Sequence, residues 1–131
     1  MFFVVAIDGP AASGKGTVAS KIASHFKFSY LDTGLIYRAV AKLAYQKVGE
    51  KTFEESAIEI AKSFSHNFLN VGGLKTNDIA ELASKVAVIP EVREALISFQ
   101  RKFSEKTGGT VLDGRDIGSY ICPNAQVKFY I

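Results

Sequence analysis

A short apolar run followed by a glycine-rich loop constrains this chain more than any other feature. Residues 2–7 read Phe-Phe-Val-Val-Ala-Ile, and residues 9–17 read Gly-Pro-Ala-Ala-Ser-Gly-Lys-Gly-Thr. The apolar run predicts a buried strand, and the residues after the loop predict a helix. In that context successive backbone N–H groups and the helix N-terminus converge on one point, which forms an anion site. The order of strand, loop and helix therefore favours a phosphate-binding loop over an ordinary glycine-rich turn.

The loop departs from the general phosphate-binding pattern at one position. Gly16 follows Lys15 where a Ser or Thr is usual, and the hydroxyl comes one residue later, on Thr17. Lys15 adds a mobile positive charge for the β- and γ-phosphates of a nucleotide. The Gly-Lys-Gly-Thr form is typical of nucleotide kinases and not of GTPases.

Composition sets the class of protein. The 131 residues are 47% hydrophobic, which predicts one compact domain with its own core. The net charge is only +3 and the basic residues are scattered, so no nucleic-acid partner is expected. Cys122 is the single cysteine, which excludes an internal disulfide and fits a reducing cytoplasm. The N-terminal apolar run is too short for a signal peptide, and we expect no membrane association.

Strands and helices alternate along the rest of the chain. Beyond the strand at 2–7, strands are expected at residues 28–31, 110–112 and 126–131. Helices are expected at residues 15–26, 35–47, 52–64, 77–88 and 90–103. The segment 67–75 reads as a loop or a weak hairpin. This alternation predicts an α/β fold with a parallel sheet and helices on both faces.

Apolar spacing predicts which side chains are buried. The expected apolar stripe of the first helix consists of Val18, Ile22, Ala23 and Phe26. Four phenylalanines are assigned to the core: Phe2, Phe3, Phe99 and Phe103.

Three further clusters fall at strand ends or on helices that could face one cleft. They are Asp32-Thr33-Gly34 with Tyr37-Arg38, Ala83-Ser84-Lys85 with Arg93, and Asp113-Gly114-Arg115-Asp116. Together with residues 7–17 and the stretch Ile89-Pro90-Glu91-Val92-Arg93, they resemble the bacterial cytidylate kinase family, whose members phosphorylate CMP and dCMP. The resemblance covers essentially the whole chain. It implies the fold of P-loop nucleoside-monophosphate kinases, with ATP and Mg²⁺ as cofactors.

The resemblance also implies a role for each matching residue. The ATP phosphates would contact Gly9, Pro10, Ala11, Ala12, Ser13, Gly14, Lys15, Gly16 and Thr17. Mg²⁺ would be approached by Thr17 and, through water, by Asp113. The catalytic charges would come from Lys15, Arg38 and Arg115. The substrate would be bound by Thr33, Tyr37, Arg38, Ser84, Arg93, Arg115 and Asp116. Of these, Arg38 and Arg115 would hold the acceptor phosphate, and cytosine would be recognised by Ser84, Arg93 and Asp116.

Several alternatives stay open at this point. Arg38 and Arg93 could be ordinary surface cations, and Asp32 could be a helix cap. Asp8 could contact the loop or Mg²⁺, or could orient the loop. A related hypothesis is that the chain is another small P-loop kinase, such as one for adenylate or shikimate.

The family continues beyond the fourth strand with an arginine-rich lid, whereas this sequence stops at Ile131. We therefore expect residues 1–131 to be a single P-loop kinase domain truncated before the lid. Within it, approximately residues 48–90 would form a small monophosphate-binding subdomain. A weakly active or inactive nucleotide-binding fragment is the alternative. A complete chain is expected to be a monomer, whereas the truncated one could associate through the edge of its last strand.

Overall fold

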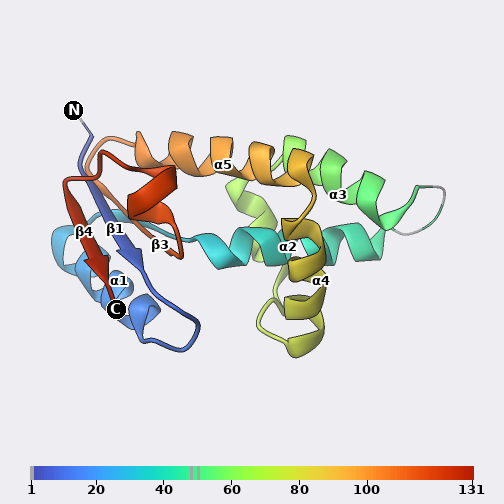
Figure 1. Ribbon diagram of the computed structural model, residues 1–131, viewed down its shortest axis with the longest axis horizontal. Coiled ribbons are helices and arrows are strands. Elements are labelled where there is room, and N and C mark those ends of the chain that lie inside the picture. Colours follow the sequence, from blue (N-terminus) through green and yellow to red (C-terminus); the bar gives the residue numbers. More distant parts are fainter. Residues whose placement is uncertain (1, 48, 50) are drawn as a thin grey trace. The chain divides into compact units, whose positions relative to one another are not determined.

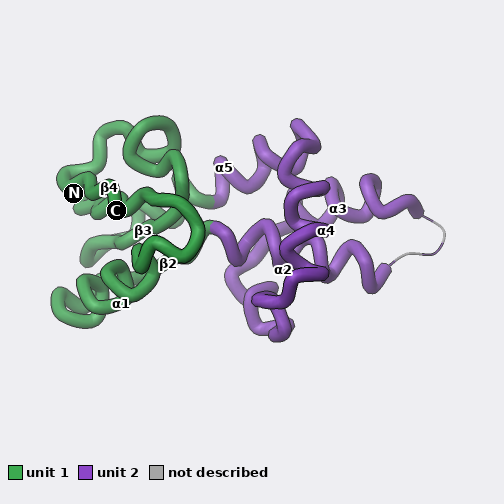
Figure 2. Tube along the Cα trace, turned by 60° about the horizontal axis from the view of Figure 1, so that its bottom comes forward, with its two compact units in different colours: residues 1–33, 100–131 green, residues 34–99 purple. Residues whose placement is uncertain are grey.

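The computed structural model describes residues 2–47, 49 and 51–131, and these fall into two compact units (Figure 2). Unit 1 comprises Met1–Thr33 and Gln100–Ile131, and unit 2 comprises Gly34–Phe99. Val48, where the expected small subdomain begins, lies outside the described residues. Within the described part of the chain, no helix is long and apolar enough to cross a membrane.

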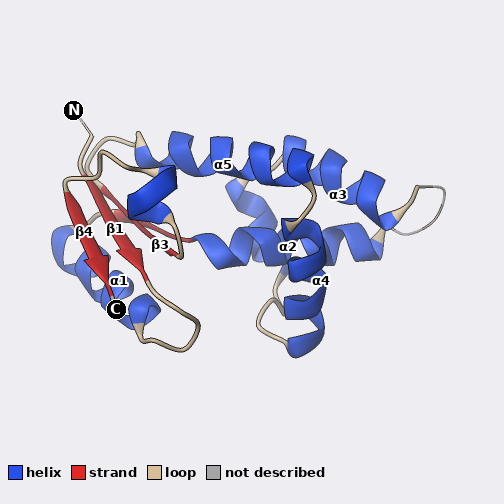
Figure 3. Cartoon of the chain, in the orientation of Figure 1, coloured by secondary structure: helices blue, strands red, loops and turns tan. Residues whose placement is uncertain are grey.

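Unit 1 is built on a parallel sheet that contains four strands among the described residues (Figures 1 and 3). The strands are β1 (Val4–Asp8), β2 (Ser29–Asp32), β3 (Thr110–Gly114) and β4 (Val127–Tyr130), in the order β2-β3-β1-β4. Every residue of β1 and β3 is buried, as expected for interior strands of a parallel sheet. The parallel α/β architecture predicted from the sequence is confirmed, and β4 forms one edge of the sheet beside β1.

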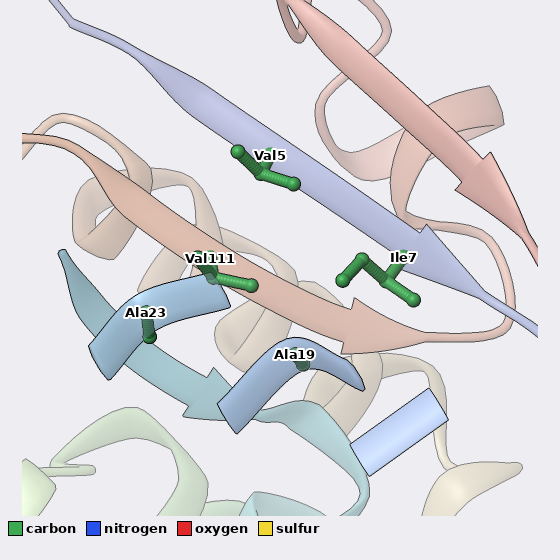
Figure 4. Packing of buried hydrophobic residues seen from close by; sticks show 5 residues of the cluster. All are labelled: Val5, Ile7, Ala19, Ala23 and Val111. Carbon is green, nitrogen blue, oxygen red and sulfur yellow. The ribbon is translucent and has the colours of Figure 1, made fainter. Parts of the chain in front are cut away.

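Helix α1 (Lys15–Phe26) packs on one face of this sheet and has the bounds that the sequence predicted. Val5 and Ile7 of β1 and Val111 of β3 point toward Ala19 and Ala23 of the helix (Figure 4). The small alanine side chains allow close approach of helix and sheet.

The predicted apolar stripe of α1 is partly wrong. Val18 and Phe26 are 37% and 59% exposed, whereas Ala19, which the stripe omitted, is fully buried. A helix that approaches a sheet through alanines leaves its larger apolar residues at the margin of the contact. The contact face is therefore rotated away from the one that the largest side chains indicate.

The opposite face of the sheet carries a single turn of π-helix, η2 (Ile117–Ile121), which the sequence did not predict. Ile117 and Ile121 are buried there. Phe103 is buried as predicted, but the assignment of Phe2 and Phe3 to the core is wrong, because they are 45% and 41% exposed. Both precede Val4, where the buried part of the strand begins, and Phe3 lies at the margin against Phe28 with ring centroids 5.7 Å apart.

Unit 2 is helical. It contains most of α2 (Thr33–Gln46) and α5 (Pro90–Ser104), together with α3 (Phe53–Lys62), the 3₁₀-helix η1 (His66–Val71) and α4 (Asn77–Ala87). Its core includes Ile36, Val40, Val86, Val92 and Leu96.

Local sequence signals explain where the helices of unit 2 begin. The Thr52 hydroxyl accepts from the Glu55 N–H at 3.1 Å and caps α3. Thr76 caps α4 in the same way, accepting from the Ile79 N–H at 3.2 Å, and it directly precedes residue 77, where the sequence predicted that this helix begins. Pro90 occupies the first turn of α5, where its missing N–H costs nothing.

Candidate functional site

The glycine-rich loop connects the end of β1 to the start of α1 through a backbone with two left-handed positions. Ala12 has φ +59° and Gly14 has φ +88°. Such alternation turns successive N–H groups toward one side and makes a concave anion site. Gly9 N–H donates to the Gly114 carbonyl at 3.1 Å, which ties the start of the loop to the end of β3. A Cβ on Gly9 would lie 2.6 Å from the Ile131 carbonyl oxygen, so the close backbone approach requires glycine here.

The residues of the loop fit a bound phosphate. The Ser13 hydroxyl oxygen is buried and has no hydrogen-bond partner among the described residues. Gly14, which precedes α1, offers no capping side chain, and no acidic residue lies in the first turn, so the first-turn N–H groups face the loop uncapped. Lys15 Nζ donates to the Pro10 carbonyl at 3.1 Å, which folds the ammonium over the same loop. An anion seated here would satisfy these donors.

A buried carboxylate lies beneath the loop. Asp113, at the end of β3, is 2% exposed and accepts a hydrogen bond from the Tyr30 hydroxyl of β2. A Cβ built on Gly16 would lie 3.9 Å from Asp113 Oδ2 and 3.8 Å from the Tyr30 hydroxyl, so both groups approach the loop directly. Tyr30 was not among the predicted site residues. The predicted strand at 28–31 contained it, but only the pairing of Asp32 with Asp113 brings its hydroxyl to the carboxylate.

The charge state of this pair follows from its surroundings. Burial raises the pKa of Asp113 to about 6; the Tyr30 hydrogen bond and the Lys15 charge oppose the rise, and the Asp32 and Asp8 carboxylates add to it. Burial, the hydrogen bond to Asp113 and its negative charge also raise the pKa of Tyr30. The neutral phenol is therefore the donor and the carboxyl group is the acceptor.

The donor set around the loop is of the kind that Mg²⁺ uses with nucleotides. Across residues 2–47, 49 and 51–131 no group of three or more His, Cys, Asp or Glu side chains could hold a metal by itself. Mg²⁺ is commonly bound by one or two carboxylates together with phosphate oxygens and water. Asp113 provides a carboxylate beside the phosphate loop. Thr17 is exposed in the first turn of α1.

Residues 113–116 are held to the sheet at their first residue. The Thr33 hydroxyl donates to the Asp113 carbonyl at 2.8 Å. A Cβ on Gly114 would lie 2.5 Å from that same hydroxyl, so the contact requires glycine. Thr33 is buried, and its observed contact is with backbone; its predicted role in lining the nucleotide pocket stays a prediction. Arg115 and Asp116 follow, and both are exposed.

Asp8 has a role that the sequence left open. Its carboxylate is 8% exposed and accepts from the Ile117 N–H at 2.7 Å and from the Gly118 N–H at 2.9 Å. These contacts attach the start of η2 to β1. At the other end of η2, Arg101 donates to the Ile121 and Tyr120 carbonyls, each at 3.1 Å.

Four of the predicted substrate residues belong to unit 2. Arg38 on α2 donates to the Leu74 carbonyl at 3.0 Å, and Ser84 on α4 donates to the Ala80 carbonyl one turn back at 3.1 Å. Arg93 is exposed on α5, and Tyr37 is half-buried on α2. The structure thus groups residues 9–17 with Thr33, Asp113, Arg115 and Asp116 in unit 1. The roles proposed for the residues of unit 2 stay predictions.

A phosphate loop that follows the first strand of a parallel sheet defines a P-loop nucleotide-binding protein. The family model described as cytidylate kinase matches residues 5–131, and the chain belongs to the cytidylate kinase family. It is 54% identical over 129 residues to a protein named cytidylate kinase from Bartonella bacilliformis, covering 98% of this chain and 60% of the relative. Proteins of the same name from Methylocella silvestris and Rhodopseudomonas palustris are 49% and 48% identical, each over 98% of this chain and over 59% and 60% of the respective relatives. The chain therefore spans about 60% of the length of the curated relatives that it matches.

Proposed function

We propose that the full-length protein is an ATP-dependent kinase that transfers the γ-phosphoryl group of ATP to CMP or dCMP, giving CDP or dCDP. The observation that carries this proposal is the phosphate loop with a buried carboxylate beneath it, in a chain of the cytidylate kinase family. We also propose a cytoplasmic location and a monomer. We propose no nucleic-acid partner, in line with the small net charge and the scattered basic residues.

Phosphoryl transfer asks the protein mainly for alignment and neutralisation of charge. In our proposal the loop N–H groups and the Ser13 hydroxyl bind the ATP phosphates, and Lys15 moves from the Pro10 carbonyl to the transferring phosphoryl group. Mg²⁺ bound with ATP would neutralise phosphate charge, with Thr17 and, through water, Asp113 as the residues that hold it. A phosphate oxygen of CMP is itself the nucleophile, so no protein nucleophile is required.

The acceptor nucleotide needs a different set of groups. Arg38 and Arg115 would hold its phosphate, because a guanidinium presents paired donors to phosphate oxygens. Thr33 and Tyr37 would line the nucleotide pocket. Cytosine presents an N4 amino donor, which suits the carboxylate of Asp116, and O2 and N3 acceptors, which suit Arg93 and Ser84. Uracil presents a carbonyl oxygen in place of the amino group and would be repelled by a carboxylate.

Calorimetry of nucleotide binding to the full-length protein tests this assignment. An unmatched buried polar pair costs about 1–3 kcal/mol, so CMP should bind roughly tenfold to a hundredfold more tightly than UMP. The substitution Asp116→Asn should reduce that preference, because an amide can also donate to the uracil oxygen. Asp78→Asn, at an exposed carboxylate in the first turn of α4, is the control and should leave the preference unchanged. Equal binding of CMP and UMP by the unsubstituted protein would refute the proposed specificity.

A further inference from the structure

Asp8 joins three parts of unit 1 at one residue. It is the last residue of β1, where it pairs with Gly114 of β3 and Tyr130 of β4. Its carbonyl accepts from the Ile131 N–H at 2.9 Å. The phosphate loop begins at the next residue, and the Asp8 side chain reaches the start of η2.

The carboxylate matches its two donors closely. Each of its oxygens accepts one N–H group, from Ile117 at 2.7 Å and from Gly118 at 2.9 Å. Both groups stand at the start of a helical turn, where N–H groups have no partner within the turn, and the residue at the N-cap, Asp116, makes no side-chain hydrogen bond to them. Hydrogen bonds to a charged acceptor are stronger than those between neutral groups. A Cβ on Gly118 would lie 3.2 Å from the Lys128 side chain and 3.4 Å from Asp8 Oδ2, so the carboxylate lies in van der Waals contact with this part of η2.

The two exposed residues between Gly114 and η2 are therefore held on both sides. On one side, Gly9 donates to the Gly114 carbonyl and Thr33 to the Asp113 carbonyl. On the other side, the two bonds to Asp8 fix the residues that follow. Arg115 and Asp116 lie between these anchors and are the two residues to which the proposed function assigns contacts with the acceptor phosphate and cytosine.

We propose that Asp8 is a positioning residue for the acceptor nucleotide: by holding the start of η2, it fixes Arg115 and Asp116 relative to the phosphate loop that begins at Gly9. This inference rests on the proposed function. It differs from a role in binding Mg²⁺ or in shaping the loop, because the groups that the carboxylate contacts belong to η2. Loss of the Asp8 carboxylate should therefore affect the acceptor nucleotide much more than ATP.

The test compares CMP and ATP affinities of the full-length protein and of Asp8→Asn by calorimetry. Asparagine keeps the shape but has one acceptor oxygen, and its amide nitrogen would face an N–H group. We expect the affinity for CMP to fall by at least about tenfold and the affinity for ATP by less than about threefold. Hydrogen exchange should show faster exchange at the Ile117 and Gly118 amides. Asp78→Asn should change neither affinity.

A second variant guards against poor folding of Asp8→Asn. Asp8→Ala removes both acceptor oxygens without placing an amide nitrogen against the Ile117 and Gly118 N–H groups, so it should weaken CMP binding in the same selective way. Either of two results would overturn the inference: unchanged CMP affinity when the two amides exchange faster, or equal losses for CMP and ATP. If the unsubstituted protein binds ATP but not CMP, the proposed function fails in the wild type, and the inference about Asp8 fails with it.

Discussion

At the level of single residues, the Tyr30 hydroxyl and the Asp113 carboxylate form a polar pair beneath the phosphate loop. The residues come from β2 and β3, which are adjacent in the sheet but more than 80 positions apart in sequence. Asp113 was predicted from the motif at residues 113–116. Its partner was not, because a hydrogen bond between parallel strands depends on their register, which sequence spacing does not specify.

Removal of the Tyr30 hydroxyl should destabilise the protein measurably. Tyr30→Phe leaves Asp113 almost fully buried with one hydrogen bond fewer, and a buried group left unsatisfied costs about 1–3 kcal/mol in the free energy of unfolding. Urea denaturation monitored by circular dichroism provides the measurement. The control Tyr45→Phe removes the hydroxyl of a side chain that is 62% exposed and should stay within about 0.5 kcal/mol of the wild type. Equal stabilities of the two variants would show that the Tyr30 bond contributes nothing.

At the level of helices and strands, the sequence predicted the features that depend on neighbouring residues. It did not predict the features that depend on packing between distant residues. The start of α1 after the loop and the start of α5 at Pro90 were predicted, because the glycine-rich loop and proline act on the neighbouring backbone. The turn η2 was not predicted. It depends on Asp8 and Arg101, which are distant in sequence and bind its two ends.

The entry to β3 provides a test at this scale. Gly108 and Gly109 both have positive φ, of +89° and +93°, so a Cβ strains either position. At Gly108 a Cβ would meet nothing within 4 Å, whereas at Gly109 it would lie 2.4 Å from the Phe28 ring. Gly109→Ala should therefore lower the free energy of unfolding by about 1–3 kcal/mol more than Gly108→Ala. Denaturant unfolding of both variants would show the difference, and equal losses would mean that the Phe28 contact is unimportant.

At the level of the whole molecule, the contiguous sequence motifs were the main basis for predicting the candidate site. The residues at 9–17 and 113–116 lie in one compact unit, as expected when a phosphate loop and the end of the adjacent strand meet at one edge of a parallel sheet. The roles of Arg38, Ser84 and Arg93 depend on substrate contacts and stay predictions. The edge position of β4 is confirmed, but association through that edge is untested.

The most direct measurement of the central claim is a coupled assay of nucleoside-diphosphate formation by the full-length protein with ATP, Mg²⁺ and CMP, UMP or AMP. We expect kcat/KM for CMP to exceed that for UMP by at least about tenfold. Lys15→Ala should lower the rate with CMP by at least about 10²-fold, because a contact that strengthens in the transition state is lost. The control Lys21→Ala, at an exposed position on the same helix, should leave the rate unchanged. No phosphorylation of CMP, or an unchanged rate in Lys15→Ala, would contradict the account.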